Sequence, residues 1–206
     1  MTIIKKQDKG NYCLISVNGT DLRVAESGSD FYSFKYKTSG LRYELGLCML
    51  TGEIVWLNSP YECGMWNDIQ IFRNYLISHL EEGELVEVDD GYVGDAPEHV
   101  KCPASFVNPE ETLYMQQRIR NRQEAVNKRL KNWGILKQVY RHEFSRHGEY
   151  VRACLVVTQL LIKNGGPLFD CSYRDPPYDI DSRTSVNDAC ESDNDDGLSY
   201  DTIMSL

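Results

Sequence analysis

Two acidic residues stand out in the sequence because their surroundings suit ligand chemistry. Asp89 follows the apolar segment at residues 85–88 and precedes Asp90 and Gly91. A carboxylate at the carboxyl end of a buried strand projects into the crevice where open α/β sheets bind ligands. An Asp-Gly turn is the simpler interpretation, and the spacing alone favours it.

Glu124 is the second such residue, on a helix predicted for residues 110–133. The apolar positions of this helix form one buried stripe, made of Met115, Ile119, Val126, Leu130 and Trp133. Glu124 lies on the opposite face, among Arg120, Asn127, Lys128 and Lys131. The spacing alone favours a solvated face, on which Arg120 and Lys128 would form i,i+4 pairs with Glu124.

Other chemistries find little support. His142 and His147 are five residues apart, which fits neither a helical ligand pair nor a HExxH motif, so structural or substrate-contacting roles are favoured for them. No GxGxxG, GxxxxGK[ST] or GxSxG motif occurs. The seven cysteines are widely spaced without a CxxC pair, which argues for reduced thiols rather than disulfides or a zinc site.

The charge is unevenly distributed along the chain. The formal net charge is −9, but residues 170–206 contain ten acidic residues and two arginines. Residues 118–152, in contrast, contain ten Arg or Lys residues against three Glu. Local patches rather than the total charge determine attraction to phosphate. The composition of residues 174–206 predicts an acidic disordered tail.

Residues 12–173 are predicted to form one α/β domain with a mixed sheet, preceded by a short extension at residues 1–11. Hydrophobic patterning and turn residues predict these elements. Strands are expected at residues 12–24 (with a kink at Asn18-Gly19), 31–37, 41–50, 53–57 and 84–88. Three helices are expected: one that is capped by Asn67 or Asp68, one at residues 110–133 and one at residues 148–163. A loop is expected at 58–64 and irregular structure at 93–109. No membrane span or signal peptide is predicted, so an intracellular protein is expected.

Read in order, several segments resemble the DDE superfamily endonuclease domain of Harbinger-type and related eukaryotic transposases. They are VNGTD at 17–21, SGLRYELGL at 39–47, GEIVW at 52–56, PYECGMWND at 60–68, VDDGYVGD at 88–95, RIRNRQEAVNKRLKNWGIL at 118–136, YRH at 140–142 and GPLF at 166–169. The resemblance covers residues 14 to 173. The Asp-x-Gly-Tyr strand end and the basic helix are its most specific parts.

The resemblance implies a ribonuclease-H-like fold, with a mixed five-stranded sheet flanked by helices and three catalytic carboxylates that converge on it. Carried over to this chain, the second catalytic and metal-binding position is Asp89 and the third is Glu124. The first position, in a motif that normally begins with Asp, is Asn18.

The activity implied by the resemblance is DNA cleavage or strand transfer that depends on Mg²⁺ or Mn²⁺. Two such ions stabilise the attacking and the leaving oxygens of a phosphodiester, and carboxylates hold these hard cations. The basic helix would hold the DNA backbone near the metal ions, through Arg118, Arg120, Arg122, Lys128 and Lys131.

Asn18 departs from this pattern in the property that matters most. An amide retains one oxygen but lacks the negative charge with which a carboxylate bridges two dications. Metal occupancy and turnover are therefore expected to be orders of magnitude lower than with an Asp at this position. Asp21 is a poor replacement, because a residue three positions along a strand points to the opposite side of the sheet.

A second departure concerns the region before the catalytic core. Transposases of this type carry a helical DNA-binding region there, whereas about a dozen residues precede the first strand of this chain. A fragment, a truncated gene model or a domesticated remnant is therefore expected. A separate DNA-binding partner protein and, in a eukaryote, nuclear localisation are expected with it. The alternatives are an inactive domain that binds DNA or protein, and an α/β protein with no role on nucleic acid.

Overall fold

The computed structural model describes residues 13–96 and 98–169. These residues all belong to one compact unit, Met1–Tyr173. The second unit, Arg174–Leu206, lies outside the described residues. The predicted acidic tail and the predicted extension at residues 1–11 therefore also lie outside them.

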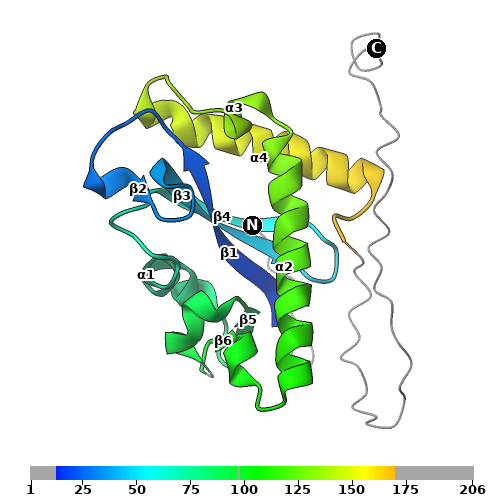
Figure 1. Cartoon of the computed structure of the whole chain (residues 1–206). Helices are drawn as coiled ribbons and strands as arrows, with labels where there is room; N and C mark the ends of the chain where they lie inside the picture. Colours follow the sequence, from blue (N-terminus) through cyan, green and yellow to red (C-terminus); the bar gives the residue numbers. More distant parts are fainter. Residues whose placement is uncertain (1–12, 97, 170–206) are drawn as a thin grey trace. The chain divides into compact units, whose positions relative to one another are not determined.

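The described residues form a mixed, open sheet flanked by helices (Figure 1), so the predicted α/β class is confirmed. The strands are β1 (Cys13–Arg23), β2 (Tyr32–Ser33), β3 (Thr38–Cys48), β4 (Ile54–Glu62), β5 (Leu85–Glu87) and β6 (Val100–Lys101). β3 pairs antiparallel with β1, β4 and the short β2. β5 runs parallel to β1, and β6 runs parallel to β5.

The helices are α1 (Asp68–Ile71), α2 (Pro109–Lys131), α3 (Gly134–Lys137) and α4 (His147–Gly165). α1 begins at a capping box between Asn67 and Gln70 and continues as a π-helical turn and a 3₁₀ turn to His79. Asn108 caps the start of α2, because its side chain accepts a hydrogen bond from the Glu110 amide. None of the helices among the described residues is long and apolar enough to cross a membrane.

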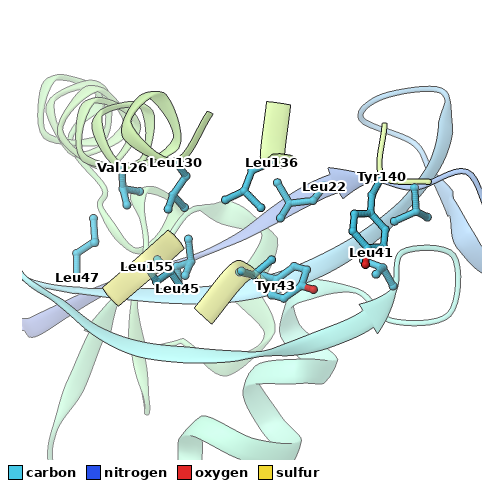
Figure 2. Packing of buried hydrophobic residues seen from close by; sticks show 12 residues of the cluster. Leu22, Leu41, Tyr43, Leu45, Leu47, Val126, Leu130, Leu136, Tyr140 and Leu155 are labelled. Carbon is cyan, nitrogen blue, oxygen red and sulfur yellow. The ribbon is translucent and has the colours of Figure 1, made fainter. Parts of the chain in front are cut away.

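The larger apolar core lies between the sheet and the helices α2, α3 and α4 (Figure 2). Alternate residues of β3 point into it, because side chains alternate between the two faces of a strand. Its buried members include Leu22, Leu41, Tyr43, Leu45, Leu47, Val126, Leu130, Leu136, Tyr140 and Leu155. The predicted stripe of the long helix supplies Val126 and Leu130, and Trp133 packs against this core while half-buried.

A second core covers the other face of the sheet, towards the π-helical turn after α1. Val17 of β1 and Val86 of β5 contribute to it from the sheet. Phe72 and Tyr92, which are fully buried, pack edge to face with ring centroids 5.7 Å apart. β1 thus has its odd residues on this face and its even residues on the α2 face.

Several predicted boundaries were wrong. The register of β1 against β3 is continuous from Ile15 to Arg23, so no kink occurs at Asn18-Gly19. Only residues 32–33 of the predicted strand at 31–37 pair, because the chain turns back at Lys37, whose φ is 56°. The predicted loop at 58–64 is strand to Glu62, because the long β3 offers it partners and an edge strand tolerates Pro60.

Two further elements differ from the prediction. The irregular segment at 93–109 contains β6, which at two residues is too short for a hydrophobic period to reveal. Gly134 follows the end of α2 as predicted, but it also begins the short helix α3.

Candidate functional site

A pocket of about 500 Å³ opens where β1, the carboxyl end of β5 and the middle of α2 meet. Each of the three predicted acidic positions contributes to its wall. The lining residues are Asn18, Lys35, Asp89, Asp90, Gly91, Pro103, Gln116, Ile119, Arg120, Gln123, Glu124 and Asn127. Residues that are more than one hundred positions apart in the sequence therefore come together around one cavity.

Asn18 reaches the pocket because the even-numbered residues of β1 face α2. The residues on either side of it on this face contact the helix: Gln123 donates a hydrogen bond to Ser16 at 3.4 Å, and Thr20 donates one to Asn127 at 2.7 Å. β5 ends at Glu87, which pairs with Ser16, so no strand among the described residues lies beside β1 on that side at Asn18. The side-chain amide of Asn18 forms no hydrogen bond with any described residue, whereas its backbone lies in the ladder between β1 and β3.

Asp89 is positioned by the turn that follows β5. Its Oδ1 accepts a hydrogen bond from the Gly91 amide at 2.9 Å and caps the 3₁₀ turn Asp90–Asp95. The two interpretations of Asp89 are therefore compatible, since the Asp-Gly turn itself holds the carboxylate at the pocket. Asp90 has an anchoring role, because it accepts a hydrogen bond from the Ala104 amide at 2.8 Å.

Glu124 lies on the face of α2 that lines the pocket, and its side chain is exposed. The pairs that a solvated helix face would form are missing: among the described residues, no ion pair joins Glu124 to Arg120 or Lys128. Arg120 and Asn127 line the same pocket. The carboxylate of Glu124 is thus available to a ligand.

The five predicted DNA-contacting residues separate into two groups. Arg118 and Arg122 form ion pairs with Glu87, which is fully buried, and Arg122 is itself buried. Both arginines are therefore bound to a carboxylate of the domain itself, and removing either would weaken a buried ion pair; that they contact DNA stays a prediction. Arg120 and Lys128 are exposed, and Lys131 lies 5.5 Å above the ring of Tyr36. Helical periodicity placed all five on the helix but could not reveal the buried carboxylate.

Asp21 lies on the opposite side of the sheet from Asn18, as predicted. Its carboxylate accepts hydrogen bonds from Arg42 at 2.8 and 3.0 Å and from Ser33 at 2.6 Å. Burial works against ionisation, but the hydrogen bonds from Arg42 and Ser33 prevail and lower the pKa of Asp21. Asp21 therefore belongs to a buried ion pair and does not replace the missing carboxylate.

Asp68 is a carboxylate near the site that the sequence did not single out beyond helix capping. It lies against β1 so closely that a Cβ atom on Gly19 would be 1.8 Å from its Oδ1. Burial is the main cause of its raised pKa; Arg42 opposes the shift, and the negative charges of Asp21 and Asp89 add to it. Asp68 does not line the pocket.

The histidines do not contribute to this site. His147 is buried at the start of α4, where its Nδ1 hydrogen bonds with the hydroxyl of Tyr43. Burial lowers the pKa of His147 to about 4, which makes it a neutral structural residue at physiological pH. His142 is exposed and packs against Tyr140.

The donor atoms of the pocket suit hard cations, which prefer oxygen ligands. Asp89 and Glu124 supply carboxylates, and Asn18 supplies an amide oxygen. Among the described residues, no group of three or more His, Cys, Asp or Glu side chains is arranged to hold a metal ion. With two carboxylates and an amide, the set carries one negative charge less than three carboxylates would.

Comparison with known proteins adds no relative. No family model matches the chain, and neither a curated protein nor a solved structure matches it. The function of the pocket is therefore inferred from its residues and from the order of the motifs along the chain.

Proposed function

We propose that this domain is the catalytic core of a DDE-type transposase, with a ribonuclease-H-like fold and a divalent-metal site for DNA phosphodiester cleavage or strand transfer that is weakened by Asn18. The observation that carries the proposal is the convergence of Asn18, Asp89 and Glu124 on one pocket. These are the three positions at which the transposase pattern expects its carboxylates.

The arrangement of the sheet supports the proposed fold. An antiparallel meander of β1, β3 and β4 continues into the parallel strands β5 and β6. This is a mixed five-stranded sheet, to which only the two-residue β2 is added. The three site positions lie on the first strand, after the β5 strand and on a later helix, in the order that the resemblance implies.

Bound Mg²⁺ or Mn²⁺ would activate a water molecule and stabilise the leaving oxygen of a phosphodiester. Asp89 and Glu124 would hold the ion, and the amide oxygen of Asn18 would be the third protein ligand. The hydrogen bond from the Gly91 amide holds Asp89 in place. Lys35 and Arg120 line the same pocket and supply positive charge for a phosphate group.

Restoring the missing charge tests the proposal. The Asn18→Asp variant should bind Mn²⁺ at least about tenfold more tightly in calorimetry, since one carboxylate in a shared site is worth more than about 1.4 kcal/mol. It should also gain Mn²⁺-dependent cleavage of duplex DNA. Asn121→Asp is the matched control, because it adds the same charge to an exposed site on α2 outside the pocket.

The double variant Asn18→Asp with Glu124→Gln should lose what the single variant gains. If Asn18→Asp folds normally and shows neither tighter Mn²⁺ binding nor cleavage, the assignment of the three catalytic positions is wrong. Circular dichroism and thermal unfolding of each variant establish that the fold is intact.

A second candidate function is a non-catalytic module that binds DNA or protein. The lack of a group of three metal-ligating side chains among the described residues favours it, as does the amide at position 18. DNA binding would then persist without metal and weaken steeply with salt. In fluorescence anisotropy with a labelled duplex, Arg120→Ala should weaken binding and reduce the salt dependence, whereas Arg129→Ala, which is exposed outside the pocket, should change both less.

A further inference from the structure

The helix α4 has an apolar face that the described residues leave uncovered. Its inner face is buried at Val151, Leu155, Thr158 and Ile162, of which Val151 and Leu155 belong to the larger core. Its outer face presents Val156, Val157, Leu160 and Leu161, which are 60, 42, 53 and 54 % exposed. Monomeric soluble proteins rarely expose large contiguous apolar patches, and such patches mark interaction sites.

The exposed residues follow the spacing of a helix-packing seam. Glu149, Ala153, Val156, Leu160 and Lys163 succeed one another at intervals of four, three, four and three residues. This alternation keeps the side chains on one line along the helix, as at the a and d positions of a coiled coil. Val157 and Leu161 widen the seam on one side, so a second helix could pack along α4.

The charges at the two ends of the seam indicate which helix fits. Glu149 lies at the amino-terminal end and Lys163 at the carboxyl-terminal end, and their side chains are 72 and 56 % exposed. An antiparallel copy of α4 that crosses at Val156 would place Glu149 of each chain beside Lys163 of the other. A parallel copy would instead place like charges together. The face is therefore complementary to itself in the antiparallel orientation, as a two-fold symmetric contact requires.

We propose that the outer face of α4 is a homodimer interface, in which the α4 helices of two copies of this chain pack antiparallel around Val156. The contacts that Glu149 and Lys163 now form do not prevent this. Arg146 is 3.8 Å from Glu149, and Glu53 is 3.3 Å from Lys163. The first pair is exposed and the second is partly exposed, with Glu53 30 % exposed, and such ion pairs near the surface contribute little to stability. The dimer does not depend on the function proposed for the pocket.

Analytical ultracentrifugation of the whole chain tests the apolar part of the interface. The unaltered protein should be a dimer, and Val156→Glu should make it a monomer with an unchanged circular dichroism spectrum. The matched control is Val107→Glu, which introduces the same change at a valine that is fully exposed outside α4, and it should remain a dimer. A protein that is monomeric up to its solubility limit, or a Val156→Glu variant that still dimerises, would overturn the proposal.

Charge exchange tests the antiparallel orientation. Glu149→Lys and Lys163→Glu should each weaken dimerisation at least about tenfold, because each creates two like-charge contacts across the two-fold axis. A mixture of the two variants should form heterodimers about as well as the unaltered protein, because both contacts are then between opposite charges. Single variants that dimerise normally, or a mixture that stays monomeric, would contradict this arrangement.

Discussion

The two sides of β1 place polar side chains in very different environments. On the α2 side, the carboxylates and the amide around the pocket are partly exposed and have few partners. On the α1 side, Asp21 is buried and bound by Arg42 and Ser33. Alternate residues of one strand thus supply both environments. The difference separates carboxylates that stabilise the fold from carboxylates that are available to a ligand, and this distinction can be tested.

The largest expected effect is at Asp21. Asp21→Asn would remove the charge that Arg42 needs and leave a guanidinium in a mostly buried site. Breaking a buried pair by removing one partner costs about 3–5 kcal/mol. We expect a loss near the lower end of this range, because Asp68 is 3.5 Å from Arg42 and partly compensates. Urea unfolding measures it, and a loss below about 1 kcal/mol would remove the contrast between the two sides.

The second prediction concerns pH and Glu44, which is on the α1 side. Burial raises the pKa of Glu44 from 4.5 to about 7, although Trp56 donates a hydrogen bond that lowers it. Glu44 binds its proton more tightly in the folded state than in the unfolded state, and this difference stabilises the fold. The stabilisation is complete below pH 4.5 and is lost as the pH rises to about 7.

The Glu44→Gln variant should lack this pH dependence of stability, because its side chain does not ionise. The unaltered protein should lose about 3 kcal/mol relative to this variant as the pH rises through that interval, since one pKa unit corresponds to about 1.4 kcal/mol. Unfolding curves at several pH values measure the difference. A difference that stays constant over the whole interval would show that Glu44 ionises normally.

A smaller effect is expected at Gly19, where the α1 side approaches β1 most closely. Gly19→Ala would place a Cβ atom 1.8 Å from Oδ1 of Asp68, so that side chain would have to move. Such overpacking costs about 1–3 kcal/mol, and the loss should largely disappear in an Asp68→Ala background. A double-mutant cycle by thermal unfolding measures this coupling. If the losses in the free energy of unfolding from the two single substitutions add up in the double variant, Gly19 is not required for this contact.

The smallest effects on stability are expected in the pocket. Asp89→Asn keeps the oxygen that accepts the Gly91 hydrogen bond, and Glu124→Gln removes no ion pair within the described residues. Each should change the free energy of unfolding by about 0.5 kcal/mol or less. If either variant loses as much stability as Asp21→Asn in urea unfolding, its carboxylate stabilises the fold and the functional interpretation of the pocket is weakened.

Much of the site could be predicted from the sequence because its signals are local. The apolar segment before Asp89 marks a strand end, and the helical period of residues 110–133 places Glu124 opposite the buried stripe. The two-residue period of β1 likewise separates Asn18 from Asp21. Buried partners could not be predicted. Nothing near Arg118 or Arg122 in the sequence reveals Glu87, and Asp68 meets Gly19 across nearly fifty residues.

The sequence by itself determined the α/β class, the approximate positions of the long elements and the faces on which Asn18, Asp21 and Glu124 lie. These properties follow from hydrophobic periodicity, which is a property of neighbouring residues. Only the tertiary structure decided that Asn18, Asp89 and Glu124 share one pocket, that two arginines belong to a buried ion pair, and that one face of α4 is left exposed. These outcomes depend on the packing of segments that are far apart in the chain, which no local pattern encodes.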